Sequence, residues 1–110
     1  MYESVRGRAK RVLVVGTTDG GNGISPDAAL APDGVLIVME SDAARAGEMR
    51  RRFSIDGLGA RATVIGGDPR RMLYKLSGPF DVIFCGPDYL PVVPMLEKLL
   101  APDGVIITND

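Results

Sequence analysis

Two parts of this sequence carry residues whose types and spacing could bind a ligand. The first is the glycine-rich segment 16–23, which directly follows the apolar run Val12–Val15, and the second is Glu40, which follows the next apolar run, Val35–Met39. Glycines let a backbone approach a ligand closely, and a carboxylate one strand away can accept hydrogen bonds from both hydroxyls of a ribose. The pair predicts part of a site for a nucleotide-type cofactor, and it does not specify a reaction.

Other kinds of chemistry are limited by what the sequence lacks. Its 110 residues include no histidine and a single cysteine, Cys85. Ser-His-Asp or Cys-His catalysis, histidine metal ligation, an internal disulfide and a multi-cysteine metal site are therefore excluded within this chain. With no histidine to activate it, Cys85 is interpreted as a small buried core residue.

Composition narrows the class of protein further. The 13 basic and 14 acidic residues give a net charge of -1, which provides no electrostatic basis for binding nucleic acid or an anionic membrane. No apolar run reaches the roughly 18 residues of a membrane helix, and the first residues lack the apolar stretch of a signal peptide. We therefore expect a cytoplasmic protein whose partners include neither nucleic acid nor a membrane.

The candidate ligand-binding residues need strands to position them, and five apolar runs rich in β-branched residues are the candidates. The runs are Val12–Val15, Val35–Met39, Ala62–Ile65, Asp81–Cys85 and Val105–Thr108. Each is continuous rather than alternating, which is typical of strands covered on both faces of a parallel sheet. The length and the 45% apolar composition favour one domain, residues 1–110.

Helices are predicted between these strands from capping and stop signals. The predicted helices are a short one from Ser25 that Pro32 ends, Asp42–Ile55 with Ser41 or Asp42 as cap, Asp68–Leu76, and Val92–Leu100 that Pro102 ends. Alternating strands and helices predict an α/β fold, a doubly wound Rossmann-like sheet with helices on both faces. In such a sheet the ligand crevice lies beyond the carboxyl ends of the strands, where these scattered residues would converge.

One six-residue segment occurs twice. Residues 30–35, Leu-Ala-Pro-Asp-Gly-Val, are repeated identically at 100–105. An internal duplication would explain the match, and so would a helix-to-strand turn, in which proline stops the helix and glycine reverses the chain. We prefer the explanation from turn chemistry, in which the segment marks two helix-strand junctions.

The order and spacing of five segments carry a family resemblance. The segments are 12–20, 35–42, 64–68, 79–84 and 99–107. Together they resemble the class I S-adenosylmethionine-dependent methyltransferases, and within them the O-methyltransferases related to catechol and caffeoyl-CoA methylating enzymes. The resemblance extends from about Arg11 to Asp110 and implies a mainly parallel, five-stranded sheet in the order 3-2-1-4-5, without the final antiparallel strands of the family.

The resemblance also implies S-adenosylmethionine as cofactor and a set of residues that would bind it. Gly16, Thr17, Thr18, Asp19 and Gly20 would face its amino-acid end. Glu40 would hold the ribose hydroxyls, with Ser41 beside it. Gly67 and Asp68 would lie beside the adenine, and Asp88 would approach the sulfonium and the substrate.

Each of these positions also has a purely structural interpretation. The loop could be a plain strand-to-helix turn, and Glu40 could cap the helix that follows it. Asp68 precedes Pro69, so a role as helix cap is as well supported as adenine contact. Asp88 fits a turn better than a catalytic role.

The sequence departs from the family pattern at several points. Thr18 stands where the family has the middle glycine of Gly-x-Gly-x-Gly. In metal-dependent members a carboxylate ends the fourth strand and an Asp-Asn pair ends the fifth, whereas this chain has Gly86 and the reversed pair Asn109-Asp110. Because such a site needs carboxylates to hold a divalent cation, the sequence predicts no metal site.

Two functions therefore stay open. One is methyl transfer to an oxygen of a small-molecule acceptor without a metal, with the catalytic residues unassigned. The other is a non-catalytic Rossmann scaffold or cofactor-binding module that acts through a partner or through self-association. The final strand Val105–Thr108 is expected to be an exposed edge, which a second copy could cover to form a homodimer.

Overall fold

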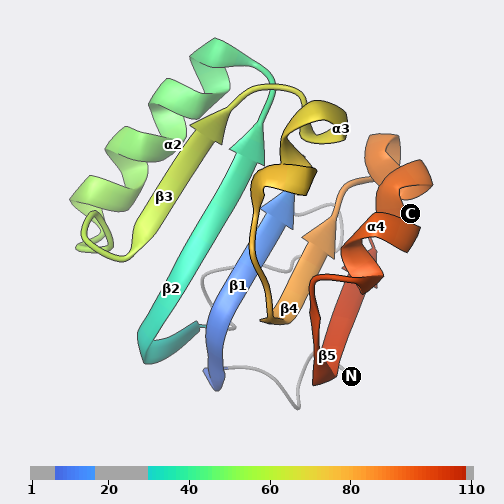
Figure 1. Ribbon diagram of the computed structural model, residues 1–110. Coiled ribbons are helices and arrows are strands. Elements are labelled where there is room, and N and C mark those ends of the chain that lie inside the picture. Colours follow the sequence, from blue (N-terminus) through green and yellow to red (C-terminus); the bar gives the residue numbers. More distant parts are fainter. Residues whose placement is uncertain (1–6, 17–29, 109–110) are drawn as a thin grey trace.

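A computed structural model describes residues 7–16 and 30–108, which contain a five-stranded sheet (Figure 1). The strands are β1 (Ala9–Val15), β2 (Leu30–Glu40), β3 (Ala62–Gly66), β4 (Phe80–Cys85) and β5 (Leu100–Thr108). They lie in the order β3-β2-β1-β4-β5, and all four neighbouring pairs are parallel. The predicted Rossmann-like order is confirmed, with β1 at the centre, where the winding reverses direction.

Hydrophobic side chains cover both faces of this sheet. On one face, Val12, Val14 and Val82 pack with α2 (Ala43–Ile55), which contributes Ala46, Met49 and Phe53. A separate set on the opposite face combines strand residues with residues of the helical segments described next; its buried members are Leu13, Val15, Met39, Leu73, Phe80, Ile83, Cys85 and Leu96. The inner strands β1 and β4 are thus buried on both sides, as their continuous apolar sequences predict.

The helical segments on the second face are short. They are α3 (Pro69–Met72), which continues into the 3₁₀ turn η2 (Leu73–Lys75), and the 3₁₀ segment η3 (Pro87–Val92), which continues into α4 (Val93–Glu97). Leu73 and Leu96 anchor them to the sheet, each with 0% of its surface exposed. Figure 1 shows these segments beside the upper, carboxyl ends of the strands.

Two predicted helix ends are wrong for the same reason. The prediction extends the fourth helix to Leu100, whereas α4 ends at Glu97 and Leu100 begins β5. Pro32, predicted to end a helix, lies inside β2, which begins at Leu30; the predicted start of that helix at Ser25 lies outside the described residues. In both places, pairing with the adjacent strand begins at a leucine two residues before the proline, so the strand starts before the residue that was expected to end the helix.

The repeated six-residue segment forms the same irregularity in two strands. Ala9 pairs with Leu30 but Arg11 pairs with Val35, and likewise Phe80 pairs with Leu100 but Val82 pairs with Val105. In each case the repeat inserts extra residues into one strand of a parallel pair, which is a bulge. The repeat therefore has the same structural role at the start of β2 and of β5, and its form is a bulge rather than a turn that precedes the strand. The second copy follows the helix α4, as expected, whereas the residues before the first copy lie outside the described part of the chain.

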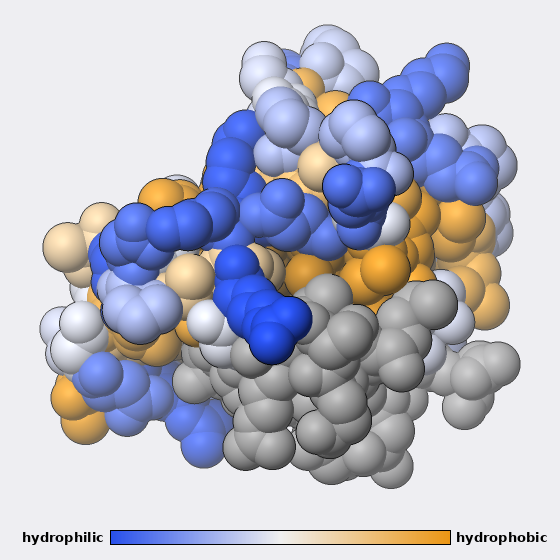
Figure 2. Space-filling model, turned by 90° about the horizontal axis from the view of Figure 1, so that it is seen from below, coloured by the Kyte–Doolittle hydropathy of each residue, from blue (hydrophilic) through white to orange (hydrophobic). Residues whose placement is uncertain are grey.

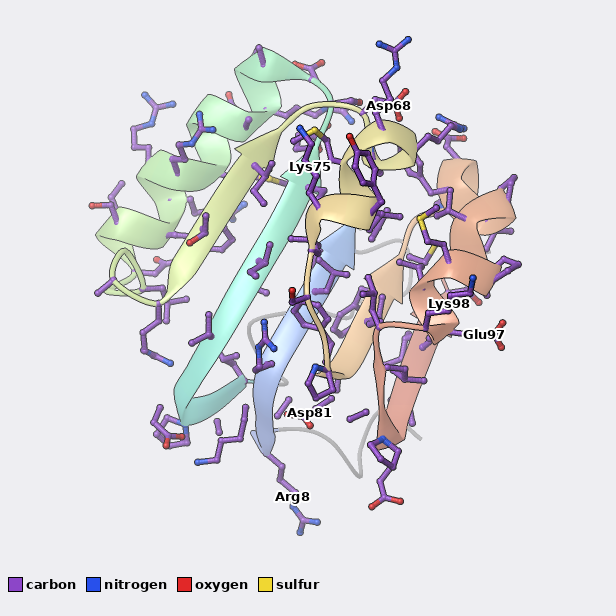
Figure 3. All side chains as sticks on the ribbon, viewed as in Figure 1. Arg8, Asp68, Lys75, Asp81, Glu97 and Lys98 are labelled. Atoms are coloured by element: carbon purple, nitrogen blue, oxygen red, sulfur yellow. The ribbon has the colours of Figure 1, made fainter. Side chains whose placement is uncertain are left out.

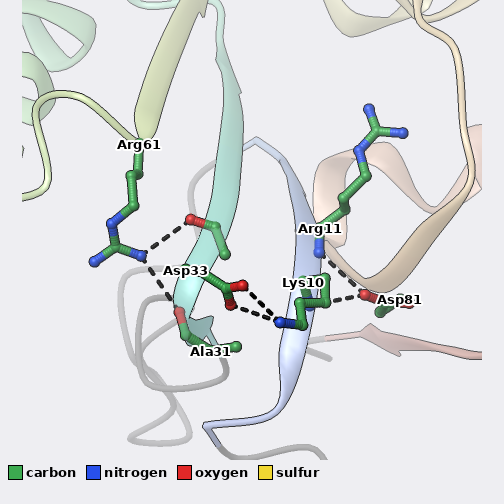
Figure 4. Close-up of polar contacts among 7 residues, drawn as sticks. Lys10, Arg11, Ala31, Asp33, Arg61 and Asp81 are labelled. Carbon is green, nitrogen blue, oxygen red and sulfur yellow. Dashed lines mark hydrogen bonds and ion pairs between the residues drawn. The ribbon is translucent and has the colours of Figure 1, made fainter.

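The amino end of the sheet is held by charged side chains (Figure 4). Lys10 Nζ lies 2.7 Å from both carboxylate oxygens of Asp33, and Asp81 Oδ2 accepts hydrogen bonds from the backbone N–H groups of Lys10 and Arg11 at 2.8 and 3.0 Å. Arg61 donates from Nη1 to the carbonyl oxygens of Ala31 and Gly34. Seen from this end, hydrophilic residues form a band across the described surface, with hydrophobic residues between them (Figure 2).

The two edge strands are less covered than the inner ones. In β3 only Val64 is buried, and the residues of β5 are half-buried or exposed. β5 pairs with β4 alone within the described residues, so the predicted exposed edge is present there. In the same part of the chain, none of the helices has the length and apolar character needed to span a membrane.

Candidate functional site

The candidate site lies at the carboxyl ends of the four strands β1 to β4. Backbone hydrogen bonds tie these ends together: Gly16 N–H donates to Met39 O at 3.0 Å, Gly67 N–H to Glu40 O at 3.1 Å, and Gly86 N–H to Val15 O at 2.9 Å. Residues far apart in the sequence therefore meet along one edge of the sheet. Figure 3 shows Asp68 at this end, whereas Arg8 and Asp81 lie at the opposite end.

Glu40 is the one charged residue that is buried among those the structure describes, with 3% of its surface exposed. It ends β2, as predicted, and its Oε2 accepts a hydrogen bond from the backbone N–H of Asp42 at 3.0 Å. Asp42 itself caps α2, because its Oδ1 accepts from the N–H groups of Ala44 and Arg45. Glu40 thus supports the entry to the helix without being its cap, and its carboxylate is held at the centre of the candidate site.

Asp68 is a helix cap in this structure. Its Oδ1 accepts from Arg70 N–H at 2.9 Å and lies 3.6 Å from Arg70 Nη1, and Pro69 follows as the first residue of α3. The structural interpretation of Asp68 is therefore confirmed. Gly67, which precedes it, has a φ of 141°, a region that favours glycine.

Asp88 lies in η3 and is exposed. Its backbone carbonyl oxygen accepts a hydrogen bond from Arg70 Nη2 at 3.1 Å, which connects the segment after β4 to α3. The backbone position agrees with the interpretation of Asp88 as part of a turn, since Tyr89 N–H donates to Gly86 O at 3.0 Å.

Tyr89 belongs to this site, although sequence reasoning did not single it out. Its ring edge lies so close to Gly16 that a Cβ on that glycine would be 2.5 Å from Tyr89 Cδ2, and its hydroxyl lies 3.2 Å from Ser41 Oγ. The guanidinium of Arg70 is 5.0 Å from the ring centroid. The Tyr89 side chain therefore reaches from the end of β1 to the end of β2, and Arg70 of α3 covers its ring.

A signal for Tyr89 was present in the sequence. An aromatic residue directly follows Gly86-Pro87-Asp88, in the loop after an inner strand of a doubly wound sheet, where ligands bind. The pattern does not say where the ring points. That depends on Gly16, whose φ of 79° and absent side chain leave room for it.

Several predicted site residues lie outside the described part of the chain. They are Thr17, Thr18, Asp19 and Gly20 of the loop. The pair Asn109-Asp110, which was not predicted to form a site, also lies outside the described residues. Gly16, Glu40, Ser41, Gly67, Asp68 and Asp88 are the predicted residues that the structure does bring to one edge of the sheet. Across residues 7–16 and 30–108, histidine, cysteine and acidic side chains form no group of three that could hold a metal ion.

Cys85 lies beneath this edge rather than in the site. It is fully buried, and burial raises the pKa of its thiol because a thiolate would be poorly solvated there. Its Sγ faces Gly86 O at 3.6 Å. These observations agree with its interpretation as a small core residue.

Comparison with solved structures places this geometry among known proteins. The O-methyltransferase TomG from Streptomyces achromogenes, in complex with S-adenosylmethionine, is 28% identical with a TM-score of 0.77, and the match covers 91% of this chain and 48% of TomG. An O-methyltransferase from Bacillus cereus, in complex with S-adenosylhomocysteine, is 26% identical with a TM-score of 0.77 and is matched over 49% of its length by 91% of this chain. An S-adenosylhomocysteine-bound methyltransferase from Podospora anserina is 25% identical with a TM-score of 0.79, over 98% of this chain and 49% of its own.

Of the comparisons with known proteins, the one with solved structures gives matches. Neither the protein-family models nor the curated proteins give a match. The chain spans about half the length of the solved structures that it matches. Over nine-tenths of its own length, this chain is a structural relative of the S-adenosylmethionine-dependent O-methyltransferases.

Proposed function

We propose that this chain binds S-adenosylmethionine at the carboxyl ends of β1 and β2 and transfers its methyl group to an oxygen of a small molecule without a metal ion. The observation that carries the proposal is the buried carboxylate of Glu40, which ends β2 in a methyltransferase-type sheet, where Gly16, the residue after β1, is hydrogen bonded to the neighbouring Met39. An acid at this place is suited to accept hydrogen bonds from ribose hydroxyls.

The residues of the site fit this cofactor in two respects. A carboxylate has about four acceptor positions, so Glu40, which accepts from Asp42 N–H, is of a type that can accept from several donors at once. Burial of Glu40 keeps bulk water from competing for those positions and strengthens each hydrogen bond. Gly16, in the left-handed region, allows the backbone after β1 to approach a ligand closely.

When bound, S-adenosylmethionine supplies an activated methyl group on a sulfonium and leaves as S-adenosylhomocysteine. The demand on the chain is therefore mainly positional, because holding donor and acceptor in line removes much of the barrier to such a transfer. Glu40 would fix the ribose, and the segments around Gly67 and Asp88 would border the adenine and the acceptor. The acceptor is proposed from the resemblance to O-methyltransferases.

A second candidate is a non-catalytic scaffold or cofactor-binding module that acts through self-association. One observation favours it: β5 forms an edge of the described sheet. Parallel edge strands present unpaired backbone groups that a second copy can cover. This candidate predicts a homodimer that persists without any ligand.

Isothermal titration calorimetry with S-adenosylmethionine and S-adenosylhomocysteine tests the leading proposal. We expect saturable binding of both ligands, and transfer of a labelled methyl group to small-molecule hydroxyl acceptors that is equal with magnesium and with a chelator. Absence of heat and of thermal stabilisation at millimolar ligand would overturn cofactor binding. Sedimentation of a ligand-free dimer at micromolar concentration would then support the scaffold.

A further inference from the structure

The ring of Tyr89 lies in the space that a ligand contacting Gly16 would need. A Cβ on Gly16 would be 2.5 and 2.6 Å from Tyr89 Cδ2 and Cε2, so the ring edge fills the volume directly beside the glycine backbone. Gly16 is the first residue after β1 and is hydrogen bonded to Met39 at the end of β2. A glycine at this position leaves space in which a ligand could approach the backbone. In this structure the ring of Tyr89 occupies that space.

Contacts at both ends of the Tyr89 side chain hold the ring in this place. Its hydroxyl lies within hydrogen-bond distance of Ser41 Oγ, at 3.2 Å, and Ser41 directly follows Glu40. Arg70 covers the ring at 5.0 Å from its centroid and also donates to the carbonyl oxygen of Asp88, the residue before Tyr89. The ring thus reaches from Gly16 to Ser41, the residue that follows the proposed ribose-binding acid Glu40.

We infer that Tyr89 competes with the cofactor for the space beside Gly16 and that it sets the affinity of the site. This inference rests on the proposed cofactor binding at Gly16 and Glu40. Binding then requires the Tyr89 ring to leave Gly16 and Ser41, with loss of its contact to Arg70. The movement is feasible because Tyr89 is only half-buried and its neighbours Pro87, Asp88 and Leu90 are exposed.

The effect of Tyr89 on affinity depends on the fraction of molecules in which its ring leaves the site open. If the ring lies over Gly16 most of the time, the apparent affinity is reduced by the fraction of molecules in which the site is open. The contacts that hold it, a hydroxyl pair and a cation–π contact, are individually weak. We therefore expect their removal to tighten binding by roughly tenfold.

Calorimetry with S-adenosylhomocysteine on a set of variants tests the inference. Tyr89→Ala removes the ring, and we expect roughly tenfold tighter binding than in the unmodified chain. Tyr89→Phe keeps the ring but loses the contact to Ser41, so it should give a smaller gain. Tyr74→Ala is the matched control, because Tyr74 is a second tyrosine on the same face that is 71% exposed, and its affinity should equal that of the unmodified chain.

Arg70→Gln tests the same role of Tyr89 in case Tyr89→Ala does not fold. Arg70 is exposed, so its replacement releases the ring without changing the hydrophobic core, and binding should again tighten. Equal or weaker binding by Tyr89→Ala and Arg70→Gln, with normal binding by the unmodified chain, would overturn the role of Tyr89 and leave the proposed function intact. Failure of the unmodified chain and of every variant to bind would overturn the proposed function and this inference together.

Discussion

Gly34 and Gly104 lie at the same point of two different strands, where each passes a carbonyl oxygen of the neighbouring strand. A Cβ on Gly34 would be 2.7 Å from Ala9 O, and a Cβ on Gly104 would be 2.9 Å from Phe80 O. Each would also clash with the leucine that begins its own repeat, at 2.7 Å from Leu30 Cδ1 and 2.8 Å from Leu100 Cδ1. Glycine is required at both places by space, because the bulge brings two backbones together.

Gly34→Ala and Gly104→Ala should therefore destabilise the protein. We expect each to lower the free energy of unfolding by about 1 to 3 kcal/mol, with the larger loss at Gly34, where the backbone contact is shorter. Urea denaturation of the purified variants measures this loss. Gly47→Ala is the control: it lies in α2 with open space around it, so the same substitution should stabilise by about 0.5 to 1 kcal/mol. Equal effects at Gly34 and Gly47 would contradict the proposed crowding.

Glu40 should matter more for ligand binding than for the fold. Glu40→Gln keeps an oxygen that can accept from Asp42 N–H, but it loses the charge that strengthens hydrogen bonds to ribose hydroxyls. We expect binding of S-adenosylhomocysteine to weaken by roughly tenfold or more, with the melting temperature little changed.

Glu48→Gln provides a matched control for charge, because Glu48 is an exposed acid on α2. Calorimetry on the two variants should show weakened binding for Glu40→Gln alone. Equal affinities in both would mean that Glu40 serves only the entry to α2.

Cys85 should be unreactive in the folded protein. Burial raises the pKa of its thiol above the ordinary 9.0, so little thiolate forms at pH 8. Alkylation by iodoacetamide should be many times slower in buffer than in urea, as followed by mass spectrometry. Rapid modification of the native protein would show that the strand end opens readily.

The same pKa shift predicts a pH effect on stability. Because the folded-state pKa of Cys85 is raised, its contribution is complete below pH 9 and is lost as the pH rises through the raised value. Comparison with Cys85→Ala isolates this group: the unmodified chain should lose more stability than the variant between pH 9 and higher pH, measured by urea unfolding.

Asp33 provides a test at the opposite end of the sheet. The hydrogen bond and charge of Lys10 lower the pKa of its carboxyl from the ordinary 3.8. Its contribution to stability is therefore present above pH 3.8 and is lost as the pH falls through the lowered value. In an NMR titration, Lys10→Met should return the Asp33 pKa toward its ordinary value, and added salt should do so in part. An unchanged pKa in Lys10→Met would contradict the ion pair.

Much of the fold could be predicted from local sequence. Continuous apolar runs such as Val12–Val15 identified strands buried on both faces, and the acid at the end of the second run, Glu40, lies where a parallel sheet brings its carboxyl ends together. Cap residues such as Asp42 and Asp68 marked helix starts correctly. These signals can be recognised in the sequence because a continuous apolar run and a helix cap each consist of residues close together in the chain.

Helix ends and site contacts could not be predicted in this way. Leu100 continued a helical pattern but lies in β5, because pairing with Phe80 of β4 decided its conformation. The bulges likewise depend on a carbonyl of an adjacent strand, which the repeated segment alone does not reveal.

The sequence by itself determined the order of strands and helices, the burial of the inner strands and the presence of Glu40 and Gly16 at strand ends. Only the tertiary structure decided that Tyr89 lies against Gly16 and reaches Ser41 beneath Arg70. The physical reason is that an apolar run indicates which strand residues are buried, but not which side chain from a distant segment packs against them. That side chain depends on the available space, which a glycine provides here.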